Sequence, residues 1–286
     1  MVRLFTDTSA NLPAALLKRY EITVIPFSYA INGETAAYPE GTDFDGAGFY
    51  NAMRGGALVK TSMINPATIA GYFEKALMQG SDVLYVGMSG GISGTAEAAA
   101  MAAADLAASY PERQIITIDT YAASLGEGLL VLEAAEMAEA GKSCQEIGAY
   151  LLARRMHMCQ FFTVDDLAYL KRGGRISGAA AVVGTLLGVK PILRGDETGH
   201  IVLCGKVRGN RRAYVELATY YDSRVLDKSA KIGIAHADNL HGAEQVLAML
   251  RECGFSGECL TVCYEPVTGA HVGPGTVALF FFGTEK

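Results

Sequence analysis

The feature that most constrains this chain is the segment VLYVGMSGGISGT, from Val83 to Thr95. Its first four residues form an apolar run that is typical of a buried strand. A loop of glycine, serine and threonine follows, and the Ala-rich residues 96–109 after it favour a helix. This order brings backbone N–H groups and hydroxyls to an anion at a helix N-terminus. The segment therefore predicts an α/β protein with an anion site at this loop.

The composition limits the classes to which the protein can belong. Of its 286 residues, 50% are hydrophobic and 19% are charged, which is enough apolar material for one large or two medium domains. A net charge of −6 argues against nucleic acid or an anionic membrane as the main partner. No apolar run approaches the roughly 18 residues of a membrane-spanning helix. The N-terminus also lacks the apolar core of a signal peptide, so we expect no stable membrane insertion.

Cysteine and histidine spacing gives no indication of a metal site. The six cysteines are scattered without any CxxC pair, which argues against structural zinc. Four of the five histidines lack a spacing that suggests metal ligation; they are His157, His200, His236 and His241. We therefore expect no metal and no cofactor, and reduced cysteines in a cytoplasmic protein.

Strand and helix patterns alternate as far as residue 156 and then change. The first part predicts a mostly parallel sheet, with a hairpin whose tip is Asn32-Gly33. The second part combines a hairpin around residues 195–199 with a β-α-β unit over residues 231–263, which indicates a mixed sheet. We therefore predict two α/β domains, residues 1–156 and 157–286.

Two further loops of the first domain carry polar side chains. The run Thr6-Asp7-Thr8-Ser9 follows the first strand and either caps a helix that starts near Leu12 or lines a site. In KTSMINP, Asn65 caps a helix with Pro66 in its first turn. Capping does not explain Thr61 and Ser62, which we place in the preceding loop, where they can face a ligand.

A histidine near the C-terminus completes a possible anion site. His271 lies in the sequence HVGPG, which we interpret as a loop before the last strand. Thr61, Ser93 and His271 together would offer two neutral donors and one titratable donor. Such a set suits a carboxylate or a phosphate, and none of the three is an obvious activated nucleophile.

One enzymatic alternative stays open. Gly87 to Gly91 matches G-x-S-x-G, the nucleophile elbow of α/β-hydrolases, so Ser89 or Ser93 with His271 as base defines a serine hydrolase. An acid such as Asp238 would complete the triad. Against it, further loop residues follow Ser89 before the helix, whereas an elbow turns directly into one. No lysine follows Gly94, which argues against a phosphate-binding nucleotide loop.

Several motifs, in order along nearly the whole chain, resemble the DegV family of bacterial fatty-acid-binding proteins. The motif from Phe162 to Ser177 is too long to match by coincidence. The matching segments are FTDTSANL, KTSMINP, SGGISGT, IDTYAASLGEG, FTVDDLAYLKRGGRIS, VKPIL, the basic run Lys206 to Arg212, and HVGPG. The first of these has Asp7-Thr8 where Asp-Ser is commoner in the family, a change that keeps the hydroxyl.

The resemblance implies a Rossmann-like domain and a second α/β domain with one long-chain fatty acid buried between them. Carried over by position, Thr61 and Ser93 would bind the acyl carboxylate. Ser62 and Gly94 would assist them, and His271 would approach from the second domain.

The resemblance also implies a role without catalysis by this chain. Family members of this kind present the fatty acid to a separate ATP-binding kinase subunit, which makes an acyl phosphate for phospholipid synthesis. Arg208, Arg211 and Arg212 would meet that subunit, although Gly209-Asn210 stands where the family more often has polar or basic residues. We expect a monomer when the kinase subunit is absent.

Overall fold

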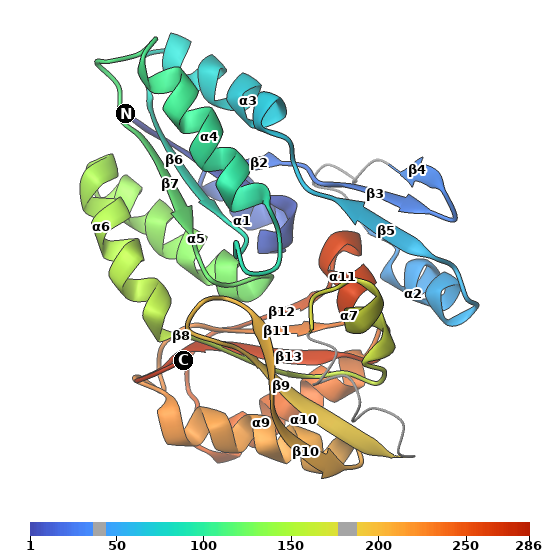
Figure 1. Ribbon diagram of the computed structural model, residues 1–286. Coiled ribbons are helices and arrows are strands. Elements are labelled where there is room, and N and C mark those ends of the chain that lie inside the picture. Colours follow the sequence, from blue (N-terminus) through green and yellow to red (C-terminus); the bar gives the residue numbers. More distant parts are fainter. Residues whose placement is uncertain (37–43, 177–187) are drawn as a thin grey trace.

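Two β-sheets, each covered by helices, form the framework of the structure (Figure 1). The computed structural model describes residues 1–36, 44–176 and 188–286, and the account below concerns these residues. The first sheet is entirely parallel, with strand order β2-β1-β6-β7. Its strands are β1 (Val2–Asp7), β2 (Thr23–Ile25), β6 (Asp82–Gly87) and β7 (Ile115–Asp119). The predicted parallel sheet is confirmed.

Six helices accompany this half of the described chain. They are α1 (Ala14–Arg19), α2 (Gly46–Arg54), α3 (Pro66–Met78), α4 (Thr95–Ala107), α5 (Leu125–Glu139) and α6 (Cys144–Arg154). Asn65 caps α3 as predicted, because its side chain accepts the Thr68 N–H. The sequence offered the run from Thr6 to Ser9 as the cap of a helix starting near Leu12. Asp7 instead caps a short 3-10 helix, Thr8–Ala10, that precedes α1.

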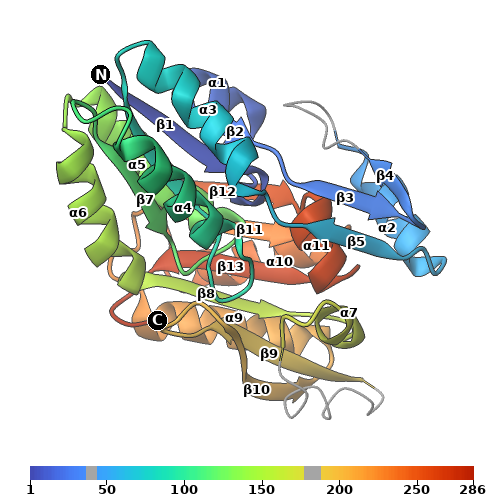
Figure 2. The ribbon, with the colours of Figure 1, turned by 45° about the horizontal axis from the view of Figure 1, so that its top comes forward.

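A small antiparallel sheet projects from the first half, beside α2 and α11 (Figures 1 and 2). It contains β3 (Ser28–Ile31), β4 (Glu34–Ala36) and β5 (Val59–Ser62), and α11 spans Pro266–Val272. Asn32 and Gly33 form the hairpin tip with φ of 52° and 91°, as predicted. Thr61, however, lies on a strand and not in a loop, because β5 pairs with β3.

The second sheet is mixed, with strand order β10-β9-β8-β13-β11-β12. Only β11 and β12 run parallel in it, which confirms the predicted β-α-β unit and the mixed sheet. The strands are β8 (Met158–Thr163), β9 (Val189–Gly195), β10 (Ile201–Arg208), β11 (Ile232–His236), β12 (Cys259–Cys263) and β13 (Val277–Phe282). Its other helices are α7 (Ala168–Arg172), α9 (Asn210–Arg224) and α10 (Leu240–Glu252).

Helix α5 lies between the two sheets (Figure 1). It packs on β1 and β6 of the first sheet and on β8, β11 and β13 of the second, and ten of its fifteen residues are buried. Its glycines permit this close approach: a Cβ at Gly128 would lie 2.5 Å from the carbonyl oxygen of Ala10. The two sheets are therefore held together through one shared helix.

Two features of the second half complete the description. His271 was predicted in a loop, but it lies in the last turn of α11; Gly273, with φ of 78°, follows directly. The predicted domain boundary near residue 156 falls in the short 3-10 helix Arg155–His157, between α6 and β8, and stays a prediction. All six cysteines are free, and in the described part of the chain no helix has the length and apolar character needed to cross a bilayer.

Candidate functional site

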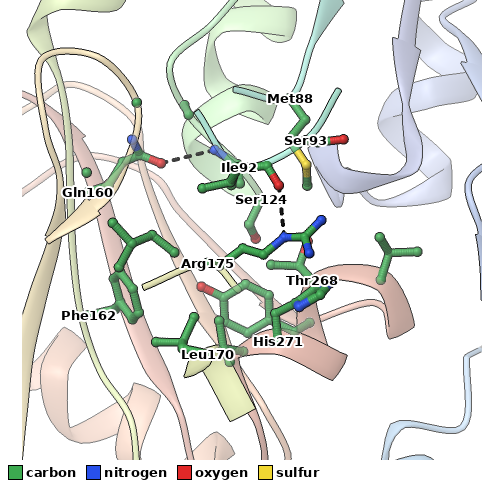
Figure 3. Close-up of a pocket in the computed structure, with 18 of the residues that line it drawn as sticks. Met88, Ile92, Ser93, Ser124, Gln160, Phe162, Leu170, Arg175, Thr268 and His271 are labelled. Carbon is green, nitrogen blue, oxygen red and sulfur yellow. Dashed lines mark hydrogen bonds between the residues drawn. The ribbon is translucent and has the colours of Figure 1, made fainter. Parts of the chain in front are cut away.

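A pocket opens between the two sheets, beside the loop that the sequence singles out as an anion site (Figure 3). It encloses about 780 Å³ of space that protein atoms do not fill, part of it open to solvent. Met88, Ile92 and Ser93 of the loop form one wall, and Phe162 and Leu170 of the second half lie opposite. Most of its lining side chains are apolar, and no aspartate or glutamate is among the described residues of the wall.

Thr61 and His271 meet at one end of this pocket. The Thr61 Oγ1 and His271 Nε2 atoms are 2.8 Å apart, which is a hydrogen bond between β5 and α11. Gly173 packs against the other ring nitrogen, since a Cβ added there would lie 2.2 Å from Nδ1. The imidazole is therefore fixed from both sides.

Ser93 faces the same end of the pocket from the loop before α4. Its buried hydroxyl lies 3.0 Å from the Thr95 hydroxyl and accepts the Thr95 N–H at 3.3 Å. Gly94 is the N-cap residue of α4. Gly94 and Ser62 are both exposed and do not line the pocket wall; Ser62 points away because it alternates with Thr61 on a strand. The structure thus brings Thr61, Ser93 and His271 to one pocket.

His271 is not the readily titrated donor that the sequence predicts. Burial first, and then the nearby Arg175 charge, lower the pKa of His271 to about 4. The imidazole is therefore neutral at pH 7, when one ring nitrogen carries a hydrogen and the other accepts. His271 acts as a neutral partner of Thr61 and not as a cation.

Arg175 supplies the cation that sequence reasoning missed. Its Nε donates to the Ile92 carbonyl at 2.9 Å (Figure 3), and its Nη1 donates to the Gly173 carbonyl. It is the only lysine or arginine in the described pocket wall and makes no ion pair with any described residue. The signal available in the sequence was its place in the motif FTVDDLAYLKRGGRIS, which the resemblance already singled out. The last residue of that motif, Ser177, lies outside the described residues.

The geometry gives no support to a serine hydrolase. The buried Ser89 hydroxyl donates to the Gly199 carbonyl at 2.9 Å and accepts the Gly91 N–H. His271 is hydrogen-bonded to Thr61 instead, and Asp238 is paired with Arg54. The three members of the suggested triad therefore have other partners.

Sequence comparison identifies the group to which the chain belongs. A family model described as an uncharacterised protein of the DegV family matches residues 1–284. The chain belongs to the DegV family. A DegV domain-containing protein of Clostridium perfringens is 35% identical over 286 residues, which cover 99% of this chain and 98% of that protein.

Solved structures of DegV family proteins share the whole fold. One described as fatty acid binding by a DegV family protein from Thermus thermophilus has a TM-score of 0.86 at 30% identity, covering 99% of both chains. A fatty-acid-binding DegV family protein from Streptococcus agalactiae has a TM-score of 0.85 at 28% identity, covering 100% of this chain and 99% of that one.

In this DegV family chain, Asp7 and Thr8, which follow the first strand and which the sequence offers as possible site residues, lie behind the pocket wall. The carboxylate of Asp7 is fully buried and accepts the Met88 N–H at 3.1 Å and the Tyr85 hydroxyl at 2.6 Å. The Thr8 hydroxyl accepts the N–H of Phe27, another wall residue. Both side chains therefore position the wall and do not line this pocket.

Asp7 also belongs to a buried acidic network. The Ser9 hydroxyl lies 2.6 Å from Asp7 Oδ1 and 2.5 Å from Glu127 Oε2, yet it has one hydrogen to donate. One of the two carboxyl groups must therefore carry a proton. Burial, followed by the charge of Asp7, raises the pKa of Glu127 well above its usual range. Burial also raises the pKa of Asp7, but Asp7 accepts two backbone N–H groups, which favour its charged form, so we assign the proton to Glu127.

The basic residues assigned to partner contact lie away from the pocket. Arg208 ends β10, and Arg211 and Arg212 occupy the first turn of α9. All three are exposed, and none forms an ion pair within the described residues. A helix N-terminus disfavours positive charge, so Arg211 and Arg212 gain nothing from their own helix.

Proposed function

We propose that this protein binds a long-chain fatty acid in the pocket between its sheets. The observation that carries the proposal is the combination of Arg175 and neutral hydrogen-bond partners at one end of an otherwise apolar pocket. The carboxylate lies among Thr61, Ser93, Arg175 and His271, with Ser62 and Gly94 nearest the surface. The names of the Thermus and Streptococcus relatives, which describe fatty acid binding, support the same ligand class.

The energetics favour an acyl chain over a short carboxylate. Burying about 16 carbons contributes on the order of 10 kcal/mol before losses, at about 0.8 kcal/mol per methylene. Association and ordering offset a large share of this free energy. Each charge-assisted hydrogen bond to the carboxylate adds roughly 1.5–3 kcal/mol. The acyl tail thus determines most of the affinity, and the polar end determines which head group is accepted.

The bound carboxylate is presented to another protein for chemistry. We propose an ATP-binding fatty acid kinase subunit as that partner, acting in the cytoplasm on a monomer of this chain. A carboxylate oxygen attacks the terminal phosphorus of ATP, and ADP leaves, which gives an acyl phosphate for phospholipid synthesis. This chain is the lipid-binding subunit and contributes no catalytic residue. The exposed Arg208, Arg211 and Arg212 contact the kinase subunit.

Lipid recovery tests the binding proposal directly. Organic extraction or native mass spectrometry of the purified protein should yield a long-chain fatty acid, or show uptake of added oleate or palmitate. Thr61→Ala and Ser93→Ala should keep the fold and retain less lipid, whereas the exposed Thr219→Ala should retain as much as the wild type. No recovered lipid together with no uptake would reject the proposal.

A second experiment tests the partner. The combined change of Arg208, Arg211 and Arg212 to alanine should lower acyl phosphate formation by an added kinase subunit and leave lipid retention unchanged. Arg113→Ala, on another exposed loop, is the control. Equal acyl phosphate formation by the triple variant would remove these arginines from the partner contact.

A further inference from the structure

Gln160 is a buried amide in the pocket wall, on the side away from the carboxylate end. It lies on β8 and is only 8% exposed. Figure 3 shows Gln160 on the same side of the pocket as Phe162, across from Ser93 and His271. A polar side chain at this depth is unexpected where an acyl tail would lie, so its role needs a physical explanation.

The Gln160 side chain is held by the backbone of the other sheet. Its Oε1 accepts the Ala123 N–H at 3.0 Å (Figure 3), and its Nε2 donates to the Tyr121 carbonyl at 2.9 Å. Both partners lie in the loop between β7 and α5, which also lines the pocket. The amide therefore bridges the two halves of the molecule with both of its ends hydrogen-bonded.

Close packing fixes the amide further. A Cβ at Gly195 would lie 2.7 Å from Gln160 Nε2, and a Cβ at Gly126 would lie 3.0 Å from its Oε1. Real Cβ atoms essentially never approach as close as the Gly195 distance, and the Gly126 distance is unusually tight, so the amide fills the space that these two glycines leave. An acyl chain cannot displace it without breaking both hydrogen bonds.

The backbone around Gln160 closes the same end of the pocket. The tip of the β9–β10 hairpin is hydrogen-bonded to the loop of residues 88–94, because the Ser89 hydroxyl donates to the Gly199 carbonyl. A Cβ at Gly91 would lie 2.7 Å from the Gly199 carbonyl carbon and oxygen. Lys286 Nζ donates to the carbonyls of Tyr121 and Asp196, at 2.9 and 3.3 Å. These contacts fix the described backbone at this end of the pocket, so we expect it to resist displacement by a longer acyl chain.

We propose that the Gln160 amide is the stop for the methyl end of the acyl chain and so sets the longest acid that this protein accepts. The inference rests on the proposed function, because it needs the carboxylate at Thr61, Ser93 and Arg175. It assigns the two ends of the pocket different tasks: the polar end selects the head group, and Gln160 limits chain length.

Dissociation constants for a series of saturated acids of increasing length test the proposal. In the wild type, Kd should fall about fourfold per added methylene until the methyl end reaches Gln160, and then level off or rise. Gln160→Ala should move this break to acids longer by about two methylene groups, because truncation leaves a cavity. Gln160→Met keeps the length of the side chain without its amide, and its break should stay where the wild type has it.

Each result has a distinct meaning. An unmoved break in Gln160→Ala, or a break that moves equally in Gln160→Met, would overturn the length stop while fatty acid binding still stands. Should the alanine variant fail to fold by circular dichroism, Gln160→Asn keeps an amide on a shorter side chain and should move the break by about one methylene. A wild type that binds no acid of any length overturns the proposed function and this inference together.

Discussion

Single residues determine the polarity of the pocket, and Arg175 matters most among them. It is half-buried, faces no described carboxylate and is tethered through Ile92 to the loop that carries Ser93. Its charge also keeps His271 neutral, since it adds to burial in lowering the pKa of that imidazole. The polar end of the pocket therefore has one permanent positive charge, which suits one carboxylate.

Replacing Arg175 should weaken fatty acid binding strongly. Arg175→Met removes the charge-assisted hydrogen bonds that we propose to the carboxylate and keeps an unbranched side chain of similar length. We expect Kd to rise about 10- to 100-fold, which corresponds to roughly 1.5–3 kcal/mol. Calorimetric titration with palmitate measures this, with Arg113→Met as the surface control. A Kd within twofold of the wild type would place the carboxylate elsewhere.

At the scale of elements, the sequence predicts those whose signals are local. The strand before Gly87, the Asn32-Gly33 hairpin and the capped α3 all form as expected, because turn and cap chemistry acts between near neighbours. Strand β5 was missed because its pairing with β3 is not encoded within its four residues. The same limit hides Arg175 and Gln160, whose roles depend on partners more than 30 residues away.

Helix α11 was missed for a different reason. Gly269 within it and Gly273 directly after it favour a loop locally, but Pro266 at its start and the Glu265 cap were readable signals. The Glu265 carboxylate accepts the N–H groups of Val267 and Thr268 at 2.5 and 2.6 Å. The helix that holds His271 thus depends on a buried acid, whose pKa burial raises to about 7.

This cap should make stability depend on pH. A carboxyl group whose pKa is raised in the folded protein binds more protons there than in the unfolded chain. The stabilisation that this protonation adds to the free energy of unfolding is therefore lost as pH rises toward 7. Between pH 5 and 8, the wild type should lose up to about 3 kcal/mol of unfolding free energy relative to Glu265→Gln. Urea unfolding at both pH values measures the difference. Parallel pH profiles for the two proteins would contradict the assignment.

The close approach of α5 to the first sheet makes a second prediction for an element. Gly128→Ala should destabilise the protein by about 1–3 kcal/mol, because its Cβ meets the Ala10 carbonyl. Gly71→Ala is the matched control, since α3 has open space there and alanine favours a helix; it should stabilise by up to about 1 kcal/mol. Thermal unfolding of both variants tests this. Equal effects would show that packing at Gly128 is not limiting.

On the scale of the whole molecule, α5 couples the two sheets. We expect a single calorimetric transition, because neither sheet can unfold without exposing a face of this helix. If the proposed function holds, palmitate at a free concentration a hundred times its Kd should stabilise the folded state by about 3 kcal/mol, because a ligand that binds only the folded chain shifts the unfolding equilibrium. Scanning calorimetry with and without palmitate measures both effects. Two separate transitions, with only one shifted by palmitate, would disprove the coupling.

With the proton on Glu127, Asp7 organises the loop of residues 88–94 before any ligand arrives. Asp7 is an anion that holds the Met88 N–H from behind the loop, while Ser93 faces the pocket in front. The loop is thus organised from behind by an internal carboxylate, and the donors that we propose for an incoming carboxylate are already in place. Little binding free energy is then lost to ordering the loop, so more of it remains as affinity.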